Sequence, residues 1–174
     1  MNLDERILRI ARTRCHGVVA ERAVARFSRL GEHGAVWLAI GVAGQALDRG
    51  RRPAWRRATG AIAGTYVANF AIKVAVGRRR PSLPDLPPLT GTPTGLSFPS
   101  AHASTSFAGA LAFTRLGLPA APLYALAASL ALSRLYLGVH HPSDVLAGAL
   151  GGTALAAALT HAEPSGDGAR DGVA

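Results

Sequence analysis

Five apolar segments rich in alanine, glycine and leucine constrain most strongly what this chain can fold into. They cover residues 34–47, 58–76, 102–118, 120–137 and 143–160. All but the short first segment approach the roughly 20 residues that a helix needs to cross a bilayer. Small residues in long apolar runs suit closely packed membrane helices, and the pair Gly148 and Gly152 would let the last helix approach a neighbour. The sequence therefore predicts an all-α integral membrane helical bundle with about five transmembrane helices, and a soluble helical bundle is the alternative.

The strongly basic composition indicates an anionic partner. The formal net charge is +9, with 18 arginines and a single lysine, Lys73. Such a charge suits nucleic acid or an anionic membrane. The arginines lie between apolar runs without an aromatic-rich basic face, so we expect the lipid bilayer and no nucleic acid as partner. Cys15 is the only cysteine, which excludes an intrachain disulfide and leaves the redox compartment open. The oligomeric state also stays open.

The first 33 residues mix arginine with apolar residues at roughly helical spacing. This pattern predicts a basic amphipathic helix on the membrane surface, because no apolar run here is long enough for a span or a signal-peptide core. A solvated helix packed on the domain is the alternative. We therefore expect an N-terminal amphipathic helix region (1–33), a membrane-embedded domain (34–161) and a polar, Gly-rich, disordered tail (162–174).

The connection from Arg78 to Pro99 differs from the other loops. It contains six of the eleven prolines, and such a long irregular connection in a compact protein is usually functional. If the five segments cross the membrane alternately, the second and fourth end on the face where the third and fifth begin. This parity gathers the unusual polar residues on one face, beside the Pro-rich connection: Lys73, Arg80, Ser100, His102, Arg134, His140 and Asp144.

These side chains have the chemistry of a phosphate site. Lysine and arginine bind phosphate oxygens, and a helix that starts near Ser100 adds donors and partial positive charge. His102 and His140 supply the nucleophile or base and the acid that phosphate-ester cleavage needs. Asp144, about one helical turn from His140, can orient its imidazole. The alternative is a zinc site formed by His102, His140, His141 and Asp144, but the adjacent cationic side chains would repel a metal ion. We expect no metal and no cofactor.

Three spaced blocks of residues carry a family resemblance. They are Lys73-x6-Arg80-Pro81, then Pro99-Ser100-Ala101-His102, then Ser133-Arg134-x5-His140-x3-Asp144. In order and internal spacing they resemble the three-part signature of the type 2 phosphatidic acid phosphatase superfamily, which includes lipid phosphate phosphatases and vanadium haloperoxidases. Three blocks together are far more specific than any one. The family pattern has glycine where this chain has Ala101, and a positive φ at that position would strain an alanine.

The resemblance implies a role for each residue. His140 is similar to the nucleophile that takes the phosphoryl group as a phosphohistidine, and Asp144 to its orienting partner. His102 is similar to the general acid for the leaving alcohol, which later activates water. Cationic side chains and backbone donors usually bind the phosphate in phosphoryl transfer. The resemblance implies this role for Lys73, Arg80, Ser100, Ala101 and Arg134. By contrast, we expect Arg78 and Arg79 to contact lipid headgroups.

The predicted function is metal-independent hydrolysis of a phosphomonoester on a membrane lipid. The resemblance to small family members suggests a polyprenyl-linked sugar phosphate of the decaprenylphosphoryl ribose 5-phosphate type, used in cell-envelope synthesis. Phosphatidylglycerophosphate, phosphatidate and isoprenoid (pyro)phosphates are alternative substrates. A non-catalytic protein that binds headgroups is an alternative of another class, but binding needs only the cations, so the intact His102, His140 and Asp144 favour an enzyme.

The expected location is the cell membrane, as a multi-pass protein with its site at one face. By the positive-inside rule, the arginine-rich loop over residues 48–57 favours the cytoplasm. The N-terminal segment on the catalytic face carries seven arginines of its own. Translocating that segment is the harder task, so we expect the site to face the cytoplasm.

Overall fold

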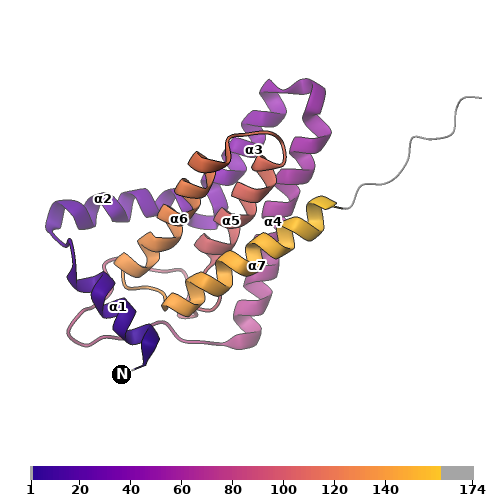
Figure 1. The fold of residues 1–174 in the computed structure, drawn as a ribbon. Helices are drawn as coiled ribbons and strands as arrows, with labels where there is room; N and C mark the ends of the chain where they lie inside the picture. Colours follow the sequence, from indigo (N-terminus) through magenta and orange to yellow (C-terminus); the bar gives the residue numbers. More distant parts are fainter. Residues whose placement is uncertain (1, 162–174) are drawn as a thin grey trace, which may run out of the picture.

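The structure, a computed structural model, describes residues 2–161. In this part of the chain it consists of helices and loops, with one isolated β-bridge between Arg79 and Leu96 (Figure 1). The predicted all-α fold is therefore confirmed, whereas the predicted disordered tail lies outside the described residues. The helices are α1 (Leu3–Thr13), α2 (Val18–Ser28), η1 (Arg29–Gly34), α3 (Ala35–Leu47), η2 (Arg49–Arg51), α4 (Arg52–Val76), α5 (Ala101–Thr114), α6 (Ala120–Tyr136) and α7 (Pro142–His161), where η denotes a 3-10 helix.

Helix α5 lies at the centre of the bundle and packs against α4, α6 and α7 (Figure 1). Most of its residues are small, which lets the neighbouring helices come close. Gly148 and Gly152 of α7 lie directly on the α5 backbone: an added Cβ would fall 2.6 Å from the carbonyl oxygen of Ser100 and 2.1 Å from that of Ser104. The close approach of the last helix thus occurs through this pair of glycines.

The N-terminal region forms two helices at an angle to each other, not the single helix predicted (Figure 1). The chain leaves the helix at Cys15, which has a φ of 58°, and α2 starts after Gly17. His16 lies in this break and is held by the carbonyl of Ala11 and by the carboxylate of Glu21. Local side-chain bonds and a left-handed residue therefore interrupt a helical periodicity that continues across them.

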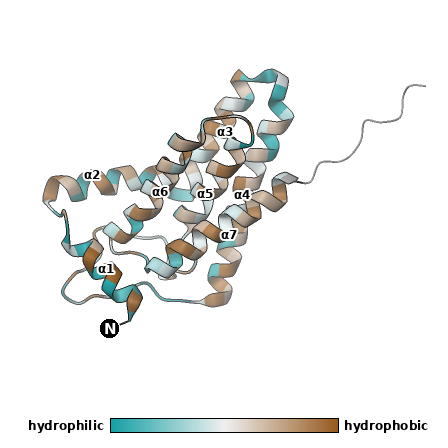
Figure 2. Ribbon diagram, viewed as in Figure 1, coloured by the Kyte–Doolittle hydropathy of each residue, from teal (hydrophilic) through white to brown (hydrophobic). Residues whose placement is uncertain are grey.

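Apolar side chains remain exposed on the outer helices. Figure 2 shows hydrophobic residues along α7 and at the lower end of α4, among them the exposed Phe70, Val74, Leu146 and Leu150. Among the described residues two helices, Arg49–Val76 and Pro142–Thr160, are long and apolar enough to cross a bilayer. The helices α3, α5 and α6 have 13, 14 and 17 residues, so a count of five transmembrane helices stays a prediction.

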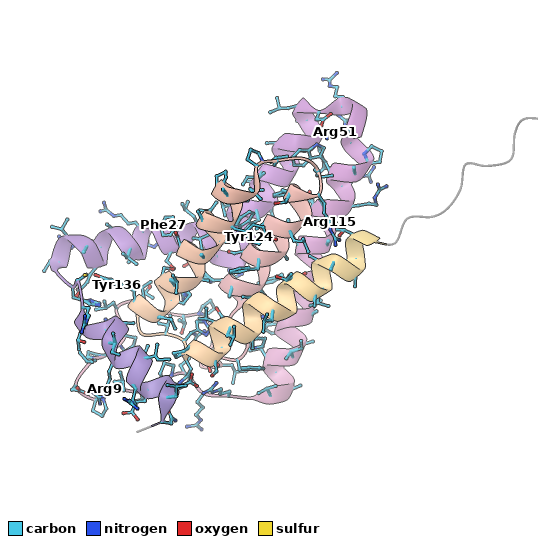
Figure 3. All side chains as sticks on the ribbon, in the orientation of Figure 1. Arg9, Phe27, Arg51, Arg115, Tyr124 and Tyr136 are labelled. Carbon is cyan, nitrogen blue, oxygen red and sulfur yellow. The ribbon has the colours of Figure 1, made fainter. Side chains whose placement is uncertain are left out.

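The two ends of the bundle differ in the residues and loops that lie there. Arg9 on α1 lies at the lower end in Figure 3, whereas Arg51, in the turn between α3 and α4, lies at the upper end. The lower end is where α4 and α6 finish, where α5 and α7 begin, and where the long loop 77–100 passes (Figure 1). This is the end at which the sequence predicts a site.

We expect Gly152→Ala to destabilise the bundle. The new Cβ would lie 2.1 Å from the Ser104 carbonyl oxygen, so α7 would have to move away from α5. Overpacking of this kind typically costs about 1–3 kcal/mol, and thermal unfolding in detergent should show a lower Tm. Gly151→Ala is the matched control, because nothing lies within 4 Å of a Cβ at that position. Equal Tm values for the two variants would contradict the tight contact.

Candidate active site

A cavity of roughly 730 Å³, including its open mouth, lies at the lower end of the bundle. Six of the eight residues predicted from the sequence line it: Lys73, Arg80, Ala101, His102, Arg134 and His140. They come from α4, the 77–100 loop, α5, α6 and the α6–α7 connection, as helix parity requires. The other two, Ser100 and Asp144, are fully buried beside it.

A tight turn between α6 and α7 places His140. Helix α6 ends in a Schellman motif, in which Val139 N–H donates to the Arg134 carbonyl and Gly138 has a φ of 74°. Helix α7 then begins with Pro142, and the Asp144 carboxylate accepts a hydrogen bond from His141 N–H at 2.8 Å. This contact caps the helix start. The short turn leaves His140 almost no freedom, and its exposure is 3%.

The two ring nitrogens of His140 face different partners. Nε2 lies 3.2 Å from Nη1 of Arg80, and because arginine only donates hydrogen bonds, Nε2 carries the lone pair. The proton is then on Nδ1, which lies 3.5 Å from Oδ2 of Asp144. That distance is long for a hydrogen bond, but the carboxylate is the anion that this N–H faces. Such an arrangement keeps Nε2 available as a nucleophile towards the cavity.

Three cations lie close to His140: Lys73 and Arg134 are buried, and Arg80 is half-buried. Lys73 donates to the carbonyls of Ser97 and Pro99, and Arg80 donates to those of Thr94 and Val139. Arg134 is 5% exposed. Within the described residues, no carboxylate forms an ion pair within 4.0 Å of these three side chains. Buried positive charge without a counter-ion suits an incoming phosphate.

His102 lies in the first turn of α5 and lines the same cavity as His140. Its Nε2 is 3.0 Å from the carbonyl oxygen of Ser28, so Nε2 is the protonated nitrogen. Ser100 is the N-cap of α5, and its hydroxyl accepts from Ala103 N–H. Its side chain thus fixes the helix start and does not line the cavity. Ala101 lines the cavity and begins α5.

The replacement of the family glycine by Ala101 is accommodated by the helix. In the described part of the chain, the non-glycine residues with positive φ are Cys15 and His33. Ala101 is therefore not one of them, and an alanine suits the first position of a helix.

Some residues of the site were not found from the sequence. Arg78, expected to contact headgroups, instead donates to Oδ1 of Asp144 at 2.9 Å and to Asp4 at 2.9 Å, which corrects that expectation. Asp4 also accepts from Ser143 N–H at the start of α7. Burial alone would raise the pKa of Asp4, but its hydrogen bonds with Ser143 and Arg78 outweigh burial and lower it. No local pattern connects Asp4 with residues almost 140 positions later.

The mouth of the cavity has further polar residues. Glu32 and His33 form a kink within η1, shortly before α3 begins, and both line the cavity with Tyr66 of α4. Nδ1 of His33 lies 2.7 Å from the Tyr66 hydroxyl. His33 adopts a φ of 53° there, a backbone conformation that is uncommon outside functional and turn positions.

Residues 2–161 contain no ligand set for the alternative zinc site. No three His, Cys, Asp or Glu side chains in this part of the chain are placed to hold a metal ion. Nε2 of His102 is bonded to Ser28, and Asp144 is bonded to Arg78 and His141.

A helical bundle with a cation cluster and a histidine–aspartate pair at one end is suited to binding and cleaving a phosphate ester. The family model for the PAP2 superfamily matches residues 54–165, and the chain belongs to this superfamily. It is a lipid phosphate phosphatase of that family, associated with the membrane.

Relatives agree with this assignment, and solved structures share the fold. The decaprenylphosphoryl-5-phosphoribose phosphatase of Mycolicibacterium smegmatis is 44% identical over 122 residues, 70% of this chain and 67% of that protein. The enzyme of the same name from Mycobacterium tuberculosis is 44% identical over 137 residues, 75% of each chain. Aquifex aeolicus LpxE superposes with a TM-score of 0.79 at 24% identity, over 92% of this chain and 96% of LpxE. A phosphatidylglycerolphosphate phosphatase from Bacillus subtilis gives 0.74 at 23% identity, over 91% and 83%. The two solved structures establish the fold.

We expect His140 to stay neutral in mildly acidic solution. Burial lowers the pKa of His140 from 6.5 to about 4; Arg80, Arg134 and Lys73 also lower it, whereas Asp144 raises it. A lowered pKa disfavours the protonated ring, so the lone pair of Nε2 persists at every pH above about 4. Histidine side-chain NMR in detergent, with His140→Asn to assign the signal, can follow this. Protonation near pH 6.5 would contradict the burial of the ring.

Proposed function

We propose that the protein removes the terminal phosphate of a polyprenyl-linked sugar phosphate of the decaprenylphosphoryl ribose 5-phosphate type. The observation that carries this proposal is the 44% identity to two phosphatases named for that substrate, over 67% and 75% of their lengths. The geometry of the cavity supports the same class of reaction, because nucleophile, acid and cations line one cavity. Glu32 at its mouth supplies an acceptor suited to sugar hydroxyls.

The reaction proceeds in two steps at His140. Nε2 attacks phosphorus, the N–P bond forms, and the bond to the lipid oxygen breaks as His102 gives that oxygen a proton. Lys73, Arg80 and Arg134 bind the three equatorial oxygens, where charge is spread in the transition state. The Asp144 carboxylate stabilises the positive charge that the ring of His140 acquires.

The second step returns the enzyme to its starting state. Water attacks the phosphohistidine, His102 takes a proton from it, and the N–P bond breaks. Inorganic phosphate leaves the cation cluster. Because neither step needs an electrophile other than these side chains, the proposed reaction uses no metal.

The proposed setting is a multi-pass protein with about five transmembrane helices. The exposed apolar side chains of α4 and α7 support lipid contact. The site lies at the end of the bundle next to α1 and α2, so these helices belong at the same membrane surface. Their arginines favour the cytoplasmic face.

A panel of lipid phosphates tests the substrate. Purified protein in EDTA should release phosphate faster from a polyprenylphosphoryl ribose 5-phosphate than from phosphatidate, phosphatidylglycerophosphate or a polyprenyl phosphate. His140→Ala should lower turnover at least about a thousandfold while remaining folded, as when other covalent nucleophiles are removed. Preference for another lipid would reject the proposed substrate. Loss of activity in EDTA that zinc or magnesium restores would reject the metal-free mechanism.

His102→Ala should be most harmful with a poor leaving group. General acid catalysis contributes about 10² to 10⁴ in rate, and this contribution shrinks when the leaving group departs without a proton. The variant should therefore lose more activity on an alkyl or lipid phosphate than on p-nitrophenyl phosphate, measured as single-turnover phosphorylation. His140→Ala should lose activity on both substrates by the same factor. Equal losses for His102→Ala would assign the acid to another residue, with His141 the first to test.

A further inference from the structure

The end of α2 contacts two residues of the catalytic cavity at once. Ser28, the last residue of α2, is 1% exposed. Its carbonyl oxygen accepts a hydrogen bond from Nε2 of His102 at 3.0 Å, and its hydroxyl accepts one from Nη1 of Arg134 at 2.7 Å. Helix α2 packs against α6, which carries Arg134 (Figure 1). One residue therefore links the general acid to a phosphate-binding cation.

The carbonyl determines which nitrogen of His102 exchanges protons. Ser28 is also the N-cap of η1, so its carbonyl can serve the first turn of that helix, and the second lone pair of the oxygen accepts from His102. A carbonyl only accepts, which means that Nε2 keeps its proton whether the ring is neutral or charged. Nδ1 is then the nitrogen that protonates the leaving oxygen.

The backbone that follows Ser28 also touches the His102 ring. A Cβ added to Gly31 of η1 would lie 2.7 Å from Cδ2 and 3.3 Å from Nε2 of His102. Gly31 is buried. The lack of a side chain at Gly31 thus lets η1 lie directly on the imidazole, and the ring is held from that side.

The hydroxyl fixes Arg134 in the same way. Of the described residues, Ser28 provides the hydrogen bond to the Arg134 guanidinium, while the buried Nε of Arg134 has no partner. The Ser28 hydroxyl is also hydrogen-bonded to that of Ser133, at 2.9 Å. A guanidinium anchored at one nitrogen keeps its other N–H groups for phosphate oxygens.

We propose that Ser28 is a positioning residue of the phosphatase site, acting on His102 through its carbonyl and on Arg134 through its hydroxyl. The proposal rests on the roles given above to His102 and Arg134. Residues 54–165 match the family model, so the helix that carries Ser28 lies outside the matched region. The site of this protein is complete only with that N-terminal segment.

Ser28→Ala isolates the hydroxyl, because the carbonyl remains. Removing a group that orients a metal ligand typically lowers activity or metal affinity about 10- to 100-fold. By analogy, we expect Ser28→Ala to lower kcat/KM with p-nitrophenyl phosphate by a factor of that size. The loss should shrink in an Arg134→Lys background, since the hydroxyl acts through the guanidinium. Ser106→Ala is the matched control: it removes another buried hydroxyl, the acceptor of Trp37 Nε1–H, at a residue that does not line the cavity.

Gly31→Ala tests the hold on His102. The new methyl group would displace the ring, so this variant should show the leaving-group pattern of an impaired acid: a larger loss on an alkyl phosphate than on p-nitrophenyl phosphate. Gly17→Ala, in the same N-terminal region, is its control, because nothing lies within 4 Å of a Cβ there. Gly17→Ala should behave as the unsubstituted protein with both substrates.

The outcomes separate the positioning role from simple stability. If Ser28→Ala and Ser106→Ala lose activity equally, or if Ser28→Ala and Arg134→Lys combine additively, Ser28 is structural and the proposal is wrong. Gly31→Ala should displace the His102 ring from the Ser28 carbonyl. If the variant loses the same activity on both substrates, that contact does not position the acid, and the role of the carbonyl is wrong. These assays use simple phosphate esters, so they stay informative even if the ribose-linked lipid proves not to be the substrate.

Discussion

Buried positive charge is the constraint on which the rest of the structure depends. Burying an ion costs on the order of several kcal/mol even after relaxation, and three cations lie together here. The backbone offsets part of this cost: the carbonyls of Ser97 and Pro99 hold Lys73, and that of Thr94 holds Arg80. The Pro-rich loop is therefore shaped by what the cations need, which explains why it is long and yet ordered. In the proposed reaction, a phosphate dianion would supply the negative charge that neutral carbonyls cannot.

The same constraint explains why much of the site could be predicted from the sequence. Charged residues beside apolar helices are costly, so they mark function, and helix parity alone brings Lys73, Arg134 and His140 to one end. Spacing within each block also carries information, since Asp144 is close to His140 through the first turn of a helix. Both inferences depend only on local geometry.

Long-range contacts explain what the sequence did not reveal. Ser28 and Asp4 meet the site from helices distant in sequence, and a serine or an aspartate in an amphipathic helix has no distinguishing signal. The sequence alone does not reveal that Arg78 contacts Asp144 and Asp4, because neither carboxylate is near it along the chain. The prediction of a single N-terminal helix is wrong, because hydrophobic periodicity does not reveal the left-handed backbone conformation of one residue, Cys15.

The contact between α5 and α7 fixes the starts of these two helices relative to each other. The Asp144 carbonyl accepts a hydrogen bond from Ser100 N–H at 3.0 Å, and Gly148 lies against the Ser100 carbonyl. His102 and His140 are attached to these two helix starts, so the packing of α5 on α7 fixes the spacing between the proposed acid and the proposed nucleophile. Preorganisation of this kind is what an entropically favourable phosphoryl transfer needs. The 77–100 loop and η1 contribute Gly91, Pro93, Glu32 and His33 to the cavity lining, so we expect these segments to limit the size of the headgroup that fits beside the phosphate.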